Sequence, residues 1–208
     1  MTSDHWAASS SRAPGRPART SRRGAAGPAP VVAMLALIWA VFVAETVVPG
    51  VDLVSFGLIA GDPDRWWGVF TAPFLHAGLA HIVGNTMSFV VLGTLVALRS
   101  HREFYAVTVW AMIGGGALAW VLTPAGTVVV GASGLVFGYF SDIVVGALIP
   151  GGRTLGIAVR DVLIAVVVVA VYGAAMAQGI LAAGPSVSWQ MHLGGALGGA
   201  VAALTVRR

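Results

Sequence analysis

The chain has no cysteine and no lysine, and only 10% of its 208 residues carry a charge. The missing cysteines exclude disulfides, thiolate metal sites and cysteine nucleophiles. Soluble domains carry about 25% charged residues, so this chain has too little polar surface to dissolve in water. Hydrophobic residues make up 57% of it. The composition predicts a protein of the lipid bilayer.

All twelve basic residues are arginines, and the net charge is +4. A basic balance often indicates a nucleic-acid partner. Here the arginines are grouped between apolar stretches instead of forming one patch, which is typical of a topology signal in membrane proteins. We therefore expect the bilayer, and no nucleic acid, as the partner of these residues.

Residues 1–30 differ in composition from the rest, being rich in Ser, Arg, Pro, Ala and Gly. Such a segment cannot bury a core, so we expect a disordered basic tail. A cleaved signal peptide is the alternative, because a basic stretch precedes an apolar one. The apolar run from Val31 to Val48 is longer than the 7–15 residues of a signal-peptide core, which favours an uncleaved membrane helix.

Six apolar segments follow, each of roughly 17–20 residues and thus long enough to cross about 30 Å of hydrocarbon. They predict an all-α, polytopic membrane helical bundle with six transmembrane helices, in one domain over residues 31–208. The segments are 31–49, 79–98, 104–122, 133–149, 161–178 and 189–206.

Six crossings place both termini on one side, and the arginines indicate which. Eleven of the twelve fall in the tail, in the second and fourth connections or at the C-terminus, and Arg65 alone falls on the other side. The positive-inside rule makes the arginine-rich side cytoplasmic. We expect a multi-pass protein of the plasma or inner membrane with both termini in the cytoplasm.

The first external connection, residues 50–78, contains many apolar residues and the sequence Arg65-Trp66-Trp67. Tryptophans at this density are typical of the membrane–water interface. We expect the segment to lie beside the bundle, partly immersed. An aromatic anchor is the simpler interpretation, and a gate or lid is the alternative.

Polar residues occur near the outer ends of the second, fourth and sixth segments. These are His76, His81 and Asn85, then Ser133, then His192. Burying such groups in a membrane is costly, so each is a functional hypothesis. His81 and Asn85 are four residues apart and share one helix face. Ser133 begins a helix, where free N–H groups and the positive dipole end favour a developing anion.

Small residues explain how these ends could meet. Gly131 and Gly134 flank Ser133 and allow close approach, and the sixth segment repeats glycines at Gly195 and Gly199. If that repeat packs on the fourth segment, His192 can accept the Ser133 proton and return it to a leaving amine. His81, Asn85 and the Ser133 N–H could then hold the oxyanion. No acid is placed to orient His192, which indicates a dyad.

Each element has a plainer interpretation. The glycines around Ser133 could serve helix packing alone, and His192 could make an interhelical hydrogen bond. His76 and His81 could be structural or could bind a metal. Asp142 lies nine residues after Ser133, on the opposite helix face, so we expect an interhelical hydrogen bond there.

Taken together, these motifs resemble the rhomboid family of intramembrane serine proteases. The resemblance covers residues 31–208 and lies in the order and spacing of HAGLAHIVGN over residues 76–85, GASG over residues 131–134 and HLGGALGG over residues 192–199. It implies a six-helix bundle that cleaves the transmembrane segments of other proteins in a water-filled cavity open to the outer face. It implies no cofactor and no metal.

Matched residue by residue, the resemblance implies Ser133 as nucleophile, His192 as base, and His81 and Asn85 as oxyanion donors. His76 is implied as a residue that supports the cavity. The chain departs from the family at two places. Phe137 stands where the family often has a tyrosine stacked under the histidine, which keeps the ring and loses the hydroxyl. The order Arg65-Trp66-Trp67 replaces the usual Trp-Arg.

Two other functions compete with a serine-type intramembrane endopeptidase. A non-catalytic rhomboid-like protein that binds membrane clients would be expected to lack the serine or the histidine. A transporter would suit broken helices and polar residues at the midplane, but here the polar groups gather near one face and no inverted repeat is visible. The sequence contains no His-Glu-x-x-His motif, so it gives no indication of a metalloprotease.

Overall fold

The computed structural model describes residues 26–149, 153–184 and 186–207. The predicted tail therefore lies almost wholly outside the described residues. Six long helices follow one another along the chain, joined by short helical turns and a two-strand pairing. The long helices are α1 (Ala29–Val47), α3 (Leu79–Arg99), α4 (His101–Leu122), α5 (Ser133–Leu148), α6 (Leu155–Leu181) and α7 (Trp189–Val206).

The predicted all-α bundle is confirmed, and the six helices match the six predicted segments. The largest difference is α6, which begins at Leu155 instead of residue 161. Arg160 was assigned to the connection before the fifth segment, so the apolar residues that precede it were left out of the predicted helix. In the structure, Arg153 donates to Asp161 at 2.6 Å, and this pairing lets the helix include a buried carboxylate.

Four of the long helices have the length and apolarity of membrane spans. Within the described residues, α1, α3, α4 and α6 are each long and apolar enough to cross a bilayer, and α5 is a shorter apolar helix. Along α6, large aliphatic side chains point away from the protein, with Leu163 60% and Val167 60% exposed. Such a surface suits lipid, and the chain is an integral membrane protein.

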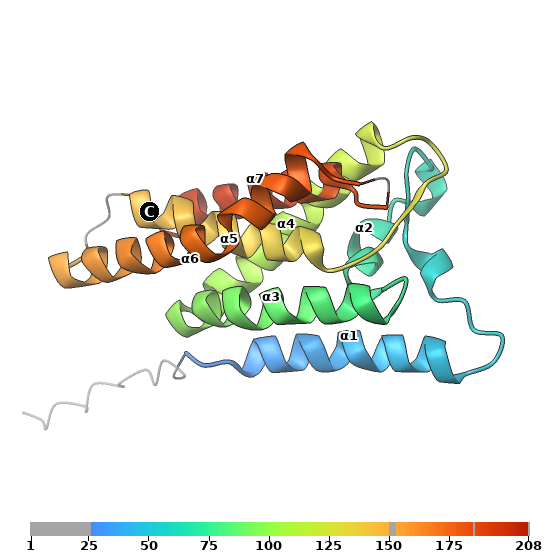
Figure 1. The fold of residues 1–208 in the computed structure, drawn as a ribbon, viewed down its shortest axis with the longest axis horizontal. Helices are drawn as coiled ribbons and strands as arrows, with labels where there is room; N and C mark the ends of the chain where they lie inside the picture. Colours follow the sequence, from blue (N-terminus) through green and yellow to red (C-terminus); the bar gives the residue numbers. More distant parts are fainter. Residues whose placement is uncertain (1–25, 150–152, 185, 208) are drawn as a thin grey trace, which may run out of the picture.

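In Figure 1, the helices run roughly along one direction, and α1 lies beside α3 at one edge of the bundle. Helix α7 packs against both α4 and α5. The N-terminal ends of α3, α5 and α7 lie at the same end of the bundle, where the first connection also folds. The sequence-distant polar residues on these three helix ends are thereby brought to one region.

Glycines bring α7 into close contact with two neighbouring helices, α4 and α5. A Cβ added to Gly195 or Gly199 would overlap the carbonyl of Gly134 or Gly138 on α5. The glycine repeat of α7 therefore lies against α5, which corresponds to the fourth predicted segment. The alternate glycines of α7, Gly194 and Gly198, approach the backbone of α4 in the same way. Helix α7 is thus fixed between two neighbours at backbone contact.

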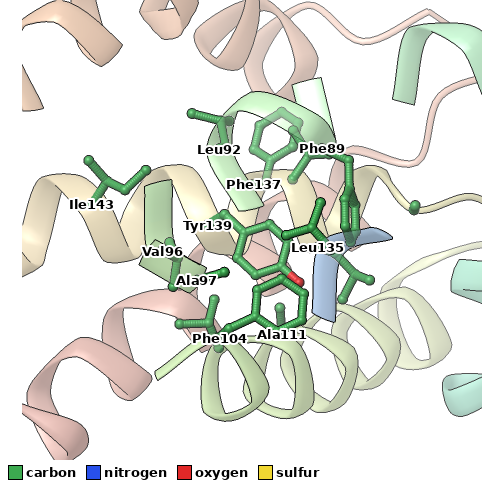
Figure 2. Close-up of a cluster of buried hydrophobic side chains, with 14 of the residues drawn as sticks. Phe89, Leu92, Val96, Ala97, Phe104, Ala111, Leu135, Phe137, Tyr139 and Ile143 are labelled. Carbon is green, nitrogen blue, oxygen red and sulfur yellow. The ribbon is translucent and has the colours of Figure 1, made fainter. Parts of the chain in front are cut away.

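The apolar core lies between α3, α4 and α5. Figure 2 shows Tyr139 among the rings of Phe89 and Phe104. The Tyr139 ring stacks on Phe104 at 5.2 Å and meets Phe89 edge-on at 5.3 Å. Its hydroxyl bonds with the Thr108 hydroxyl at 2.7 Å, so the one polar atom of this ring is satisfied. The core holds α5, and therefore its first residue, in place.

The first connection folds against the end of α4. It contains the turns η1 (Val54–Phe56), η2 (Pro63–Arg65) and η3 (Ala72–Phe74), the short helix α2 (Gly68–Thr71) and strand β1 (Leu58–Ile59), which pairs antiparallel with β2 (Val128–Val129). The Trp120 indole donates to the Asp62 carbonyl at 3.1 Å. The predicted position beside the bundle is confirmed. Arg65 lies 4.5 Å over the Trp67 ring, whereas Trp66 is 62% exposed.

At the opposite end of the bundle, buried charges pair across helices. Arg207, which caps α7, donates to Glu103 at 2.9 Å and to Asp142 at 3.1 Å. Arg99 lies 3.7 Å from the same Asp142 carboxylate, and Asp142 is fully buried. The expected interhelical contact of Asp142 is confirmed, and its partner is an arginine at the end of α7.

Candidate active site

Ser133 is the first residue of α5, directly after the turn that leaves β2. The turn depends on Gly131, whose φ of +117° lies in a region that residues with a side chain rarely adopt. The Gly131 N–H is fixed by the Ala72 carbonyl at 2.8 Å. Because the first amides of a helix have no intrahelical acceptor, Ser133 lies beside free N–H groups.

His192 lies in the first turn of α7, which Ser188 caps by accepting the Met191 N–H at 3.2 Å. Its Nε2 atom is 2.8 Å from the Ser133 hydroxyl oxygen. The structure thus brings together two side chains that are 59 residues apart in the chain, at hydrogen-bonding distance. The glycine contacts between α5 and α7 explain the approach, because larger residues would separate the two helix ends.

The other ring nitrogen of His192 has a partner that the sequence did not indicate. Nδ1 is 2.8 Å from the Gly179 carbonyl on α6. A carbonyl only accepts hydrogen bonds, so Nδ1 carries the hydrogen and the Nε2 lone pair faces the Ser133 hydroxyl. This is the tautomer that a general base requires. The partner of Nδ1 is thus a backbone carbonyl.

Phe137 lies one turn after Ser133 and covers the His192 ring. The two rings are parallel, with an interplanar angle of 9° and centres 4.1 Å apart. The phenylalanine was expected to keep the stacking face of the usual tyrosine, and the geometry agrees. With Nδ1 held by Gly179 and one face covered, His192 has little freedom to rotate away.

His76, Asn85 and Gly131 surround the other side of Ser133. The His76 Nε2 atom accepts from the Asn85 amide at 3.0 Å and from the Ala132 N–H at 3.4 Å. The pKa of His76 is lowered to about 4, mainly by burial and to a lesser extent by the neighbouring His81. The Phe74 backbone raises this pKa, but by less. His76 is therefore a neutral acceptor that ties the start of α3 to the start of α5.

His81 faces the same backbone. Its ring centre is 5.0 Å from that of His76, and a Cβ on Gly131 would come within 2.5 Å of the His81 Nε2 atom and 3.3 Å of the Asn85 amide nitrogen. Gly131 thus leaves room for two side-chain donors next to Ser133. The alternative of a metal on His76 and His81 is disfavoured, because the Nε2 lone pair of His76 is already used.

A cavity of about 590 Å³ opens over these groups. It is lined by Ser133, His192, His81 and Asn85, and also by β2 and by the α6–α7 connection, where Ser186 and Ser188 contribute hydroxyls. Neither of these two serines was predicted to lie at the site. A serine before an apolar helix predicts an N-cap, which identifies Ser188, but the pattern holds no sign that Ser186 faces the cavity.

Chemically, the cavity combines a hydroxyl that faces an unprotonated imidazole nitrogen with nearby backbone and side-chain N–H donors. This set of groups is suited to acyl transfer.

Comparison with known proteins places the chain in a family. The model of the Rhomboid domain matches residues 63–208. An uncharacterised protein of Mycobacterium tuberculosis is 38% identical over 150 residues, which cover 67% of this chain and 59% of that protein. The chain thus spans less than two thirds of the length of this relative.

Two further relatives carry rhomboid names. Rhomboid protease GluP of Bacillus subtilis is 28% identical over 157 residues, or 73% of this chain and 29% of that protein. Rhomboid-like protein 11, chloroplastic, of Arabidopsis thaliana is 31% identical over 77 residues, or 36% of this chain and 28% of that protein. The domain match covers well over half of the chain. The chain belongs to the rhomboid family of intramembrane proteases.

Proposed function

We propose that the chain is a serine-type intramembrane endopeptidase that cleaves transmembrane segments of other proteins. The observation that carries the proposal is the 2.8 Å contact between the Ser133 hydroxyl and His192 Nε2 inside a cavity. The relative GluP, named a rhomboid protease, supports the same reaction. The Ser133–His192 pair is the catalytic dyad of this proposal.

In the proposed reaction, the Ser133 oxygen attacks the substrate carbonyl while His192 Nε2 takes the hydroxyl proton. The tetrahedral oxyanion accepts hydrogen bonds from His81, from Asn85 and from the Ser133 backbone N–H at the start of α5. His192 then gives its proton to the leaving amine, which breaks the peptide bond and leaves an acyl group on Ser133. Water, deprotonated by His192, attacks this ester and restores the serine.

We further propose that the cavity opens to the outer face of the membrane and that both termini are cytoplasmic. The described arginines apart from Arg65 lie near helix ends, in a connection or at the C-terminus, at the end of the bundle remote from Ser133. They are Arg99, Arg102, Arg153, Arg160 and Arg207. The positive-inside rule favours the cytoplasm for that end. Helix α1 shares the apolar core through Val31 and Ile38, which supports one membrane domain over residues 31–208.

Covalent labelling of the purified protein tests the nucleophile without knowledge of the substrate. A fluorophosphonate probe is expected to label the wild type, and labelling is expected to vanish in Ser133→Ala and His192→Ala. Ser141→Ala removes another serine of α5 and serves as the matched control that keeps labelling. Unchanged labelling of Ser133→Ala would contradict the proposal.

The second candidate, a client-binding protein without activity, makes a different prediction. It requires that folded wild-type protein resists the probe and leaves transmembrane substrates intact in proteoliposomes. The presence of both Ser133 and His192 at bonding distance disfavours it.

A further inference from the structure

The last turn of α6 contacts the proposed base directly. Ala182 donates its N–H to the Gln178 carbonyl at 2.9 Å and ends the helical pattern. The next carbonyl along the helix, that of Gly179, lies 2.8 Å from His192 Nδ1 and accepts its hydrogen bond. Carbonyls in the last turn of a helix have no intrahelical donor, so this one is free to accept from a side chain.

The residue at position 179 must be small for this contact to exist. A Cβ there would lie 2.8 Å from the Phe137 ring and 3.1 Å from His192 Nδ1. Both distances are shorter than ordinary van der Waals contact. A side chain there would therefore force α6 and the stacked pair of rings apart, by movement of one or the other, and would disturb the contact between the carbonyl and Nδ1.

We propose that Gly179 is a positioning residue for the base: its carbonyl, at the C-terminal end of α6, fixes the orientation and tautomer of His192. The inference rests on the proposed function, since it gives His192 that role. Gly179 itself touches neither substrate nor the reacting atoms. It occupies the place that a buried carboxylate has in a catalytic triad.

The location at a helix end adds an electrostatic effect. When Nε2 takes the proton of Ser133, the imidazole becomes a cation whose Nδ1–H still donates to Gly179. The C-terminal end of a helix carries partial negative charge, which stabilises a cation there. A single carbonyl thus holds the neutral ring in the tautomer that accepts a proton and then stabilises the charged ring. The seating of α6 is thereby coupled to the chemistry at Ser133.

The wild-type protein allows a direct test. Ring ¹⁵N-labelled histidine, with the His192 signals identified by their loss in His192→Ala, reports which nitrogen carries the hydrogen. At a pH where the ring is neutral, the expected result is a protonated Nδ1 and an unprotonated Nε2. A ring protonated at Nε2 would overturn the proposal, with no need for a variant at position 179.

Kinetics of Gly179→Ala supply the second test, with Gly173→Ala as the matched control. A Cβ at Gly173 meets only Val169 of its own helix at 3.4 Å, so this variant is expected to keep wild-type turnover. In Gly179→Ala, kcat is expected to fall about 10- to 100-fold, the range of a hydrogen bond to a charged group. KM is expected to change little, and the Nδ1 proton signal to shift or broaden.

The outcomes separate the two proposals. Wild-type kcat in a folded Gly179→Ala protein, with Ser133 still labelled by the probe, would remove the role of Gly179 and leave the dyad. If instead the wild type is never labelled, the dyad fails, whereas the histidine spectra still report whether Nδ1 bonds to the carbonyl. If Gly179→Ala does not fold, the wild-type spectra alone decide.

Discussion

Phe137 stacks on His192 with the two ring planes at 9° and the centres 4.1 Å apart. Phe137 lies on α5, one turn after Ser133, and His192 lies in the first turn of α7. The contact therefore joins the beginnings of two helices. The ring covers one face of the imidazole and keeps water from it. Its role depends on shape and not on a polar atom, because phenylalanine has none.

Replacing this ring separates shape from polarity. Phe137→Tyr retains the stacking face, so its kcat is expected to stay within about twofold of wild type. Phe137→Ala leaves the imidazole free to rotate, and kcat is expected to fall at least tenfold, with about 3–5 kcal/mol of stability lost to the cavity. Cleavage assays at temperatures well below each variant's unfolding midpoint make the comparison. Equal kcat for Ala and Phe would contradict the positioning role.

The glycine contact between α7 and α5 predicts a large effect from one methyl group. In Gly195→Ala the new Cβ overlaps the Gly134 carbonyl, so the helices must separate. We expect about 1–3 kcal/mol of destabilisation and a loss of activity, because His192 moves away from Ser133. Gly84→Ala, where a Cβ meets open space, is the control. Unfolding in mixed micelles measures the stability of both variants. Equal free energies of unfolding for Gly195→Ala and Gly84→Ala would show that the α5–α7 contact accommodates the methyl group, which would contradict the prediction.

Much of this arrangement could be predicted from the sequence, because its signals are periodic or paired. Apolar length predicted the six helices. The glycine repeat around Gly195 and Gly199 predicted close packing of the last helix on a neighbour, and the fourth segment was assumed to be that neighbour. Once that contact is assumed, Ser133 and His192 can meet. The start of α6 was placed at residue 161 instead of Leu155 because Arg160 interrupts the apolar run and was assigned to the preceding connection. In the structure both Arg153 and Arg160 pair with Asp161, so the helix accommodates these charges.

The hydrogen-bond partners of His192 Nδ1 and of Asp142 could not be predicted, because no sequence pattern indicates them. The partner of His192 Nδ1 is a backbone carbonyl, and every residue has one, so Gly179 was one glycine among 28. The partner of Asp142 is Arg207, 65 residues away. That arginine was counted as a topology signal at the end of the last helix, and nothing in its position indicates that the side chain turns back into the bundle.

Asp142 pairs with Arg99 and Arg207 in a buried charge cluster. We therefore expect a second substitution to restore part of the stability that is lost when the carboxylate is removed. Asp142→Asn removes a fully buried carboxylate and leaves Glu103 as the one carboxylate paired with both Arg99 and Arg207 among the described residues, so the positive charge of the cluster is less well compensated. We expect a loss of about 3–5 kcal/mol. Adding Arg99→Gln restores the charge balance and is expected to recover part of that loss. Asp64→Asn, on an exposed residue, is the control. Additive losses in the double variant would contradict the pairing.

His76 predicts a dependence of stability on pH. Burial lowers its pKa from 6.5 to about 4 in the folded protein. Between these values the unfolded chain binds the extra proton, so the free energy of unfolding falls as the pH drops from 6.5 towards 4 and then levels off. In His76→Gln this contribution is absent. Unfolding measured across the pH range for both proteins isolates it, and parallel pH profiles would exclude a depressed pKa.

Asn85 predicts a kinetic defect in a folded protein. Its amide nitrogen donates to His76 Nε2 at 3.0 Å, which uses one of two N–H groups and leaves the other for the cavity that Asn85 lines. If that group holds the oxyanion, Asn85→Ala lowers kcat by about 10²–10³-fold with little change in KM. The reason is that the donor acts on the tetrahedral intermediate and not on the bound substrate.

A matched control variant distinguishes the loss of the Asn85 donor from a general disturbance of α3. Met87 lies two residues further along the same helix and is 68% exposed, so Met87→Ala is expected to keep wild-type kcat. The rate of fluorophosphonate labelling gives an independent readout, since the phosphonyl oxygen occupies the place of the oxyanion. Slower labelling and slower cleavage by the same factor support the donor role. A drop in cleavage with unchanged labelling would assign Asn85 to substrate binding instead, because the probe needs the oxyanion donors but not the substrate contacts.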